Sequence, residues 1–406
     1  MRRAQPLAFV ICALLALAAC RSGPPSRPAA APTTATTGPT ATTATTFPAQ
    51  RLNYAAPGTA LPSDCPPPVP RPADNGPVRG RTLAMVSAGK GFAVDDTSVV
   101  VTDDGRTWTR RWSGSDPMYS IEALDADHAW AVGQDLLLAT GDGGRTWTTA
   151  GEPDGGGLRV VDFVDPATGW GVTDAHLVRT ADGGRTWAAA DPPCGAEAVC
   201  FTGADDGWAA MGPTVYRSVD GAHSWVAAFT VPTDGLTQPF TLQSVHAAQL
   251  DCRRPGVVWA FFTARASGHH LGYVAYRGAA AGQWTPVMKE AVAGPTAVQA
   301  PAGGTHPGPM AALDPDSALF VQFSPLARAP AQLTLRRATA GGTRLGPAQP
   351  ILGLFSATAI SFLTPDVGWV LGAKTGPATV DAILATTDGG RTWQEQYSNA
   401  LPAPTG

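Results

Sequence analysis

An eight-residue segment ending in tryptophan recurs along the chain and constrains its fold more than any other feature. The copies are VTDDGRTW, TGDGGRTW, TADGGRTW, SVDGAHSW and TTDGGRTW, which end at Trp108, Trp147, Trp187, Trp225 and Trp393. We call each copy a repeat turn. The first four tryptophans lie 39, 40 and 38 residues apart, a period typical of the four-stranded blades of β-propellers. Each repeat turn therefore predicts one blade.

A second, apolar element recurs in phase with the repeat turns, as in HAWAVG and VGWVLG. Two degenerate copies of both elements occupy the long interval before the last repeat turn. One carries Trp259 and Trp284, and the other carries Phe320 and has Leu345 in place of the turn tryptophan. The apolar element then occurs seven times, centred on Phe92, Trp130, Trp170, Trp208, Trp259, Phe320 and Trp369. The sequence predicts an all-β, seven-bladed β-propeller with about 40 residues per blade, three blades being degenerate or extended.

The residue types of the repeat turn favour a tight hairpin. The aspartate can accept hydrogen bonds from backbone N–H groups of its own turn, and the glycines tolerate positive φ. The closing tryptophan buries a large apolar surface. A calcium-binding or catalytic role for these carboxylates is disfavoured, because one aspartate per blade cannot converge on one ion. We therefore assign structural roles to Asp103 and Trp108, Asp142 and Trp147, Asp182 and Trp187, Asp220 and Trp225, and Asp388 and Trp393.

These turns, of the form S/T-x-D-x-G-x-T-W, resemble the Asp-box or bacterial neuraminidase repeat. The combination of GWAVG, an apolar strand and T-x-DGGRTW looks more narrowly like the photosystem II stability and assembly factor-like family. The resemblance covers residues 85–228 and 360–396 well, and the residues between them only through degenerate copies. It implies a β-propeller and no particular activity.

The N-terminus is similar to a bacterial lipoprotein signal. Arg2 and Arg3 precede a 13-residue apolar segment that ends in Leu-Ala-Ala-Cys, with the length and flanks of a signal peptide rather than a membrane span. The resemblance implies that the signal is removed and that Cys20 is diacylated. The protein would then be anchored to the cell membrane, on its extracytoplasmic face.

A tract rich in proline and threonine follows Cys20. Residues 21–50 contain nine Thr and six Pro and almost no large apolar side chain, so they are expected to form a disordered stalk. We divide the chain into a signal peptide at 1–19, the lipidated cysteine and stalk at 20–50, the propeller at 51–400 and a tail at 401–406.

Four cysteines remain once the signal is removed and Cys20 is lipidated. An even number in an exported chain indicates two disulfides. We expect Cys194 to pair with Cys200, six residues further on, and Cys65 to pair with Cys252. A zinc site is disfavoured, because the chain has no C-x-x-C pair and no histidine at ligand spacing from the cysteines. We predict no metal and no cofactor.

Familiar catalytic motifs do not occur in the sequence. It contains no sialidase F/Y-R-I-P motif, no G-x-S-x-G, no H-E-x-x-H and no phosphate-binding glycine loop. The arginines of the repeat turns are expected on outer corners, where they cannot form a sialidase's central triad. Two carboxylates facing one cleft would suffice for a glycoside hydrolase, so a sialidase-like or other secreted glycoside hydrolase is the alternative.

Residues 229–256 and 285–317 are predicted to be insertions in neighbouring blades. In repeat proteins such insertions often form the binding face, although they could equally carry no function. A formal net charge of −4, or −6 without Arg2 and Arg3, argues against nucleic-acid binding. We expect a monomeric, lipid-anchored, non-catalytic scaffold that binds a protein or a glycan. The candidate binding residues are His246, Arg253, Arg254 and Lys289.

Overall fold

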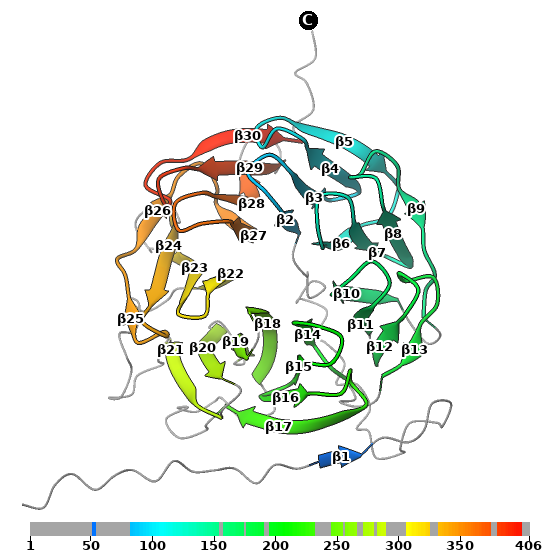
Figure 1. Cartoon of the computed structure of the whole chain (residues 1–406). Coiled ribbons are helices and arrows are strands. Elements are labelled where there is room, and N and C mark those ends of the chain that lie inside the picture. The colour runs from blue at the N-terminus through cyan, green and yellow to red at the C-terminus, as the bar shows by residue number, and fades with distance from the viewer. Residues whose placement is uncertain are drawn as a thin grey trace, which may run out of the picture. The chain divides into compact units, whose positions relative to one another are not determined.

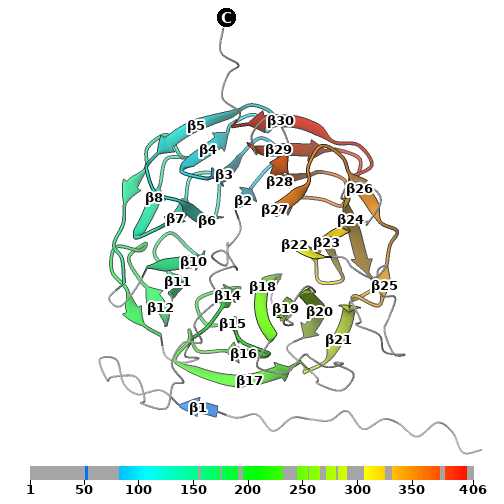
Figure 2. The same ribbon diagram turned by 180° about the vertical axis from the view of Figure 1, so that it is seen from behind.

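The computed structural model shows a ring of antiparallel sheets around a central axis (Figures 1 and 2). We call the region along this axis the channel. Seven sheets are formed, so the predicted seven-bladed β-propeller is confirmed. The described residues contain no helix that is long and apolar enough to span a membrane. The structure describes residues 51–53, 82–153, 157–173, 176–190, 195–231, 245–254, 256–265, 271–279, 282–289, 306–324, 332–374 and 380–399. The predicted signal peptide, Cys20, the stalk and the tail lie outside these residues.

In each blade, consecutive strands run from the channel to the rim. Blade 1 comprises β2 (Leu83–Met85), β3 (Gly91–Asp95), β4 (Ser98–Thr102) and β5 (Trp108–Ser113). Blade 2 comprises β6 (Met118–Ala123), β7 (Ala129–Gly133), β8 (Leu136–Thr140) and β9 (Thr148–Thr149). Blade 3 comprises β10 (Leu158–Phe163), β11 (Gly169–Thr173), β12 (Leu177–Thr180) and β13 (Ala188–Ala189).

The later blades include two additional strands. Blade 4 comprises β14 (Ala198–Phe201), β15 (Gly207–Met211), β16 (Thr214–Ser218) and β17 (Ser224–Thr230), with β1 (Arg51–Asn53) paired to β17. Blade 5 comprises β18 (Val245–Arg254), β19 (Val257–Arg265), β20 (Leu271–Ala279) and β21 (Trp284–Lys289). Blade 6 comprises β22 (His306–Asp314), β23 (Ser317–Ser324), β24 (Gln332–Thr339) and β25 (Arg344–Leu345), with β26 (Gln349–Ile351) also paired to β24. Blade 7 comprises β27 (Ser356–Phe362), β28 (Gly368–Lys374), β29 (Val380–Thr386) and β30 (Gln394–Ser398).

The recurrent apolar elements form the second strand of every blade. These strands are apolar on both faces because each blade is covered by a neighbour on either side, and every residue of β3, β7 and β11 is buried. In most blades the aromatic residue of the element packs into the seam with the following blade, as Trp130 does against Phe163 with ring centroids 3.6 Å apart. The hydrophobic core is therefore a set of seams between blades.

Blade 6 departs from the predicted register by one residue. Leu319 packs into the seam with blade 7, which is the place taken by tryptophan in most blades. Phe320 instead lies in the seam with blade 5. Adjacent residues of a strand point to opposite faces, so a shift of one residue exchanges the blade that each side chain contacts. The prediction that Phe320 is the counterpart of the repeated tryptophan is therefore wrong.

The two predicted insertions consist in part of regular strands. Within 229–256 lies β18, the innermost strand of blade 5, and within 285–317 lie most of β21 and all of β22. Those parts of the prediction are wrong, whereas residues 232–244 and 290–305 lie outside the described residues. The prolines of HPGPMAALD obscured β22 in the sequence. An innermost strand has an unpaired edge, where proline is tolerated.

The ring closes where blades 1 and 7 lie side by side (Figure 1). Among the described residues, no strand is shared between these two blades. Apolar residues of both blades form one buried cluster that includes Trp108 and Trp369. Their indole N–H groups donate to Oε1 of Gln396 at 3.3 and 3.0 Å. The hydroxyl of Tyr397 on β30 donates to the buried carboxylate of Asp95 on β3.

Candidate functional site

The carboxylate of each complete repeat turn accepts several hydrogen bonds from its own turn. In blade 2, the hydroxyl of Thr140 and the backbone N–H of Thr146 donate to Oδ1 of Asp142, both at 2.9 Å. The hydroxyl of Thr146 donates to Oδ2 at 2.7 Å. The backbone and hydroxyl bonds from Thr146 lower the pKa of Asp142 to about 2. The same pattern surrounds Asp182, Asp220 and Asp388.

In the first repeat turn, Asp104 takes this role instead of Asp103. The hydroxyl of Thr102 and the backbone N–H of Thr107 donate to Oδ1 of Asp104 at 3.1 and 2.6 Å. Counting back from Trp108, as in the other repeat turns, predicts Asp103, which is one residue too early. This turn is one residue shorter than the others between its threonine and its tryptophan. The prediction for Asp103 is therefore wrong.

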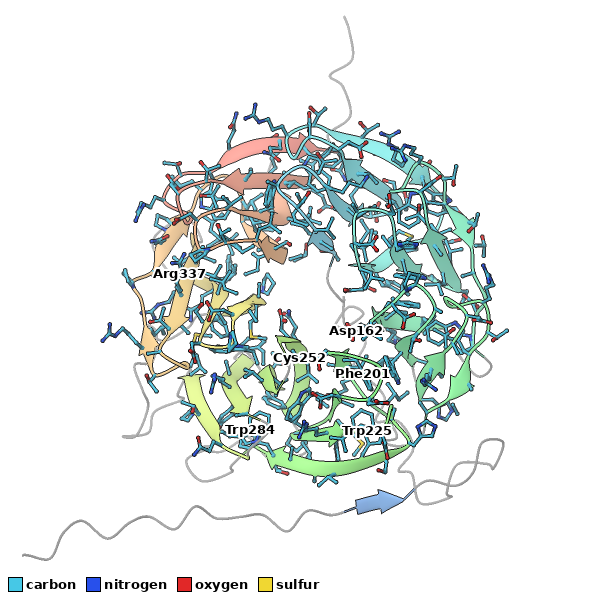
Figure 3. The ribbon with its side chains drawn as sticks, in the orientation of Figure 1. Asp162, Phe201, Trp225, Cys252, Trp284 and Arg337 are labelled. Atoms are coloured by element: carbon cyan, nitrogen blue, oxygen red, sulfur yellow. A yellow bond between two sulfur atoms is a disulfide. The ribbon has the colours of Figure 1, made fainter. Side chains whose placement is uncertain are left out.

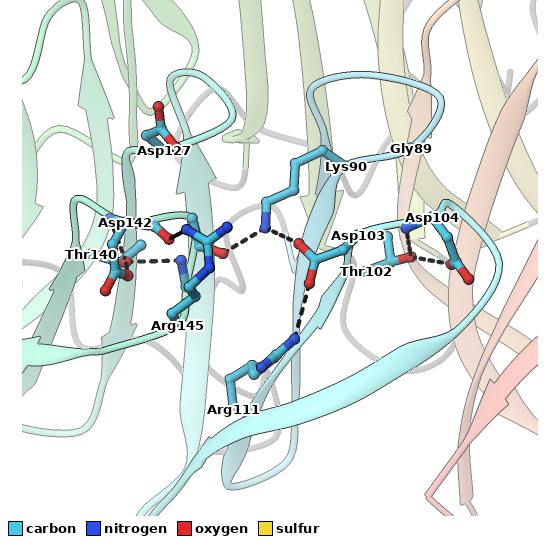
Figure 4. A network of polar contacts seen from close by, with 12 residues as sticks. Gly89, Lys90, Thr102, Asp103, Asp104, Arg111, Asp127, Thr140, Asp142 and Arg145 are labelled. Carbon is cyan, nitrogen blue, oxygen red and sulfur yellow. Dashed lines mark hydrogen bonds and ion pairs between the residues drawn. The ribbon is translucent and has the colours of Figure 1, made fainter.

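Asp103 instead belongs to a network that joins blades 1 and 2 (Figure 4). The ammonium of Lys90 lies 2.6 Å from Oδ1 of Asp103 and donates to the carbonyl oxygen of Gly143 in blade 2 at 2.5 Å. Nη2 of Arg111 lies 2.9 Å from Oδ2 of Asp103. The hydrogen bond from Lys90 lowers the pKa of Asp103. Lys90 also lies 4.9 Å from the ring centroid of Phe92, so one side chain connects two blades.

A cavity of about 300 Å³ opens on the central channel. Its wall consists mainly of innermost strands, namely β6, β10, β14, β18, β22 and β27. Four carboxylates line it, one from each of four successive blades: Glu122, Asp162, Glu197 and Asp251. Figure 3 shows Asp162 at the inner edge of its sheet. Such a wall is the place where paired catalytic carboxylates would have to lie in a glycoside hydrolase.

Two of these carboxylates accept hydrogen bonds from the backbone of the next blade. Oδ2 of Asp162 on β10 accepts from the N–H of Phe201 on β14 at 2.5 Å. Oδ2 of Asp251 on β18 accepts from the N–H of Ala312 on β22 at 3.0 Å. Asp251 is only 1% exposed. Both side chains therefore link adjacent innermost strands.

Uncharged polar side chains on the innermost strands make comparable links. The amide of Gln249 donates to the carbonyl oxygen of Met310 at 2.6 Å and accepts from its N–H at 3.0 Å. The hydroxyl of Ser120 donates to the carbonyl oxygen of Arg159 at 2.9 Å. At the closure, the N–H of Met85 donates to Oγ of Ser361 at 3.0 Å. Polar groups near the channel thus hold neighbouring blades together.

A disulfide joins Cys200 on β14 to Cys252 on β18. Both cysteines are buried, and Figure 3 shows Cys252 near the channel. The predicted pairs, Cys194 with Cys200 and Cys65 with Cys252, are wrong because each contains a cysteine that bonds elsewhere. Cys65 and Cys194 lie outside the described residues. The prediction paired Cys194 with Cys200 because they are close in sequence. The cysteines that pair lie on β14 and β18, the innermost strands of two adjacent blades, which are far apart in sequence.

The predicted binding residues fall at the ends of strands of blade 5. The backbone of His246 pairs with Thr263 near the start of β18, and Arg253 and Arg254 end that strand. Lys289 is the last residue of β21. The structure does not describe the side chains of these four residues, so their role in binding stays a prediction. Among the described residues, no group of three His, Cys, Asp or Glu side chains is placed to hold a metal ion.

Comparisons with known proteins agree with the fold. No protein-family model and no curated protein matches the chain. The structure is similar to that of YCF48 bound to a D1 peptide, with a TM-score of 0.51 and 16% identity, covering 76% of this chain and 91% of that one. YCF48 from Cyanidioschyzon merolae gives a TM-score of 0.46 and 17% identity, with coverages of 68% and 84%. An ancestral GH74 enzyme gives 0.47 and 12%, with coverages of 79% and 46%. At such identities the likeness shows a fold and no activity.

Proposed function

We propose that this protein is a non-catalytic binding scaffold built from Asp-box repeats, with a protein or glycan as its ligand. The observation that carries the proposal is the use of Asp162 and Asp251, which accept hydrogen bonds from the backbone of the adjacent blade. Carboxylates that join strands are poorly suited to receive a proton from a substrate or to attack it. The similarity in fold to YCF48, described as bound to a D1 peptide, supports a binding role.

The structural role of Asp251 can be tested by substitution. Asp251→Ala leaves the partly buried N–H of Ala312 without its acceptor, and the loss of a buried hydrogen-bond partner typically costs about 1–3 kcal/mol of unfolding free energy. We expect a lower Tm by calorimetry, while ligand capture measured well below that Tm is unchanged. Asp316→Ala, which removes an exposed carboxylate from the neighbouring blade 6, is the control for Tm. An unchanged Tm for Asp251→Ala would show that the link contributes nothing.

We propose further that a lipid on Cys20 holds the protein at the extracytoplasmic face of the cell membrane. After processing, this acyl group would be the apolar anchor, and the Pro/Thr-rich tract at 21–50 would separate the propeller from the membrane. Cys20→Ala is expected to abolish incorporation of a labelled fatty acid and to remove the mature protein from the membrane fraction. Cys12→Ala, within the signal segment, should keep both properties. Fatty-acid label that persists on Cys20→Ala would contradict the assignment.

A further inference from the structure

The seam between blades 6 and 7 contains a pocket of about 220 Å³ near the rim, which we call the seam pocket. Figure 3 shows Arg337, one of its lining residues, on β24 and away from the channel. Blade 6 contributes Leu319, Leu335 and Arg337 to its wall, and the repeat turn of blade 7 contributes Arg391. This pocket takes no part in the links around the channel.

The seam pocket exists because blade 6 lacks two features of the other blades. Leu319 occupies the place where most blades put a tryptophan against the following blade, and leucine fills less of the seam. In addition, the outermost strand is divided into β25 and β26, which pair separately with β24. Gly346 lies between them, and its N–H donates to the carbonyl oxygen of Arg337 at 2.7 Å. Backbone hydrogen bonds between this segment and β24 therefore shape the opening of the pocket.

Positive charge is concentrated in this pocket. Three arginines line it, namely Arg337, Arg344 and Arg391, against two aspartates, Asp366 and Asp388. Asp388 is the aspartate of the blade 7 repeat turn. The hydroxyl of Thr392 donates to its carboxylate at 2.6 Å, and its pKa is lowered to about 2. Its charge is therefore already stabilised within its own turn, and the pocket has one formal positive charge in excess.

The preceding seam provides an internal comparison. In blade 5, Arg277 donates to the carbonyl oxygen of Pro315 at 2.6 Å and lies 3.4 Å from Oδ1 of Asp316. In blade 6, Arg337 donates to the carbonyl oxygen of Pro365 in the same way. Among the described residues, however, no carboxylate forms an ion pair with Arg337. The guanidinium charge of Arg337 therefore has room to pair with a carboxylate of a ligand.

Gln349 provides a second polar group, besides Arg337, for a ligand to contact. Gln349 lines the seam pocket, and its buried amide oxygen accepts no hydrogen bond from the described residues. Most buried acceptors in proteins have a donor, so a ligand hydroxyl beside the amide would complete it. The remaining wall includes the apolar side chains of Leu335 and Pro347, which suit the C–H face of a sugar ring.

We infer that the seam pocket binds a uronic acid residue of an acidic polysaccharide. The carboxylate would meet the arginines, a ring hydroxyl would donate to Gln349, and the C–H face would pack on the apolar wall. The volume of about 220 Å³ is smaller than the roughly 300–1,000 Å³ of pockets for drug-sized ligands, so it suits one sugar residue. This inference rests on the proposed binding function and specifies its ligand class.

The test measures binding of tetragalacturonate to the full chain by calorimetry at low salt, beside its methyl ester and a neutral galactan oligosaccharide. The acid should bind, and both neutral probes should bind at least about tenfold more weakly, because charge-assisted bonds to arginine require the carboxylate. Added salt should weaken binding of the acid. Equal binding of acid and ester, or no binding of the acid, would overturn the inference.

Matched variants locate the site. Arg391→Gln should raise the Kd about tenfold or more, whereas Arg145→Gln, at the same position of the blade 2 turn, should leave it unchanged. Leu319→Trp restores the common seam residue and should abolish binding while the protein remains folded. Equal effects of Arg391→Gln and Arg145→Gln would show a general surface attraction and overturn the inference. Product formation in the same samples would instead contradict the non-catalytic function.

Discussion

Asp103 and Asp104 are neighbours in the first repeat turn, yet their carboxylates have different partners. Asp104 accepts hydrogen bonds from Arg106 and Thr107 within the turn, and its pKa is lowered chiefly by the backbone N–H of Thr107. Asp103 is exposed and balances Lys90 and Arg111. At the scale of residues, the number of local N–H donors decides which aspartate stabilises the hairpin.

Replacing each aspartate separately tests this assignment. Asp104→Ala removes the acceptor for two backbone N–H groups and should lower the Tm clearly. Asp103→Ala breaks exposed ion pairs, which typically contribute only about 0–1 kcal/mol, and should lower it less. Thermal unfolding followed by circular dichroism compares the two variants under identical conditions. A larger loss for Asp103→Ala would instead identify Asp103 as the aspartate that stabilises the hairpin.

Elements with strong repetition could be predicted from the sequence, and elements without it could not. Each repeat turn located a hairpin because its residue types satisfy one local geometry, and the apolar elements located the second strands. The innermost strands β18 and β22 carry no such local signal, since their partners lie in other blades. Features that depend on contacts between adjacent blades could not be predicted either. They are the hydrogen bonds of Asp162 and Asp251, the Cys200–Cys252 disulfide and the seam pocket.

The disulfide between β14 and β18 is expected to stabilise the ring. It joins cysteines separated by 52 residues, and a disulfide of this kind typically contributes about 2–4 kcal/mol. The double variant Cys200→Ser/Cys252→Ser should therefore unfold at a lower temperature and lose most of the effect of reductant on Tm. Mass spectrometry of a non-reduced digest should show the peptide containing Cys200 linked to that containing Cys252. A Cys194–Cys200 crosslink would contradict this pairing.

At the scale of the whole molecule, closure and binding are assigned to different parts of the propeller. Apolar seams hold the seven blades together. In the seam between blades 7 and 1, Gln396 also accepts hydrogen bonds from Trp108 and Trp369, and Tyr397 donates to Asp95. Polar side chains around the channel reinforce the contacts between neighbouring blades. The seam between blades 6 and 7 is the place where an irregular strand and a smaller side chain leave room for a ligand. The sequence predicted the ring from its period, but it could not predict which seam would be open.

The most direct test of a binding function without catalysis measures capture and turnover in one sample. The full chain is incubated with acidic oligosaccharides, the bound fraction is recovered, and the oligosaccharides are analysed by mass spectrometry. We expect ligand to be retained with its length unchanged, in the wild type and in Asp162→Asn and Glu197→Gln alike. Shortened products from the wild type that disappear in either variant would contradict the account and identify the channel as a catalytic site.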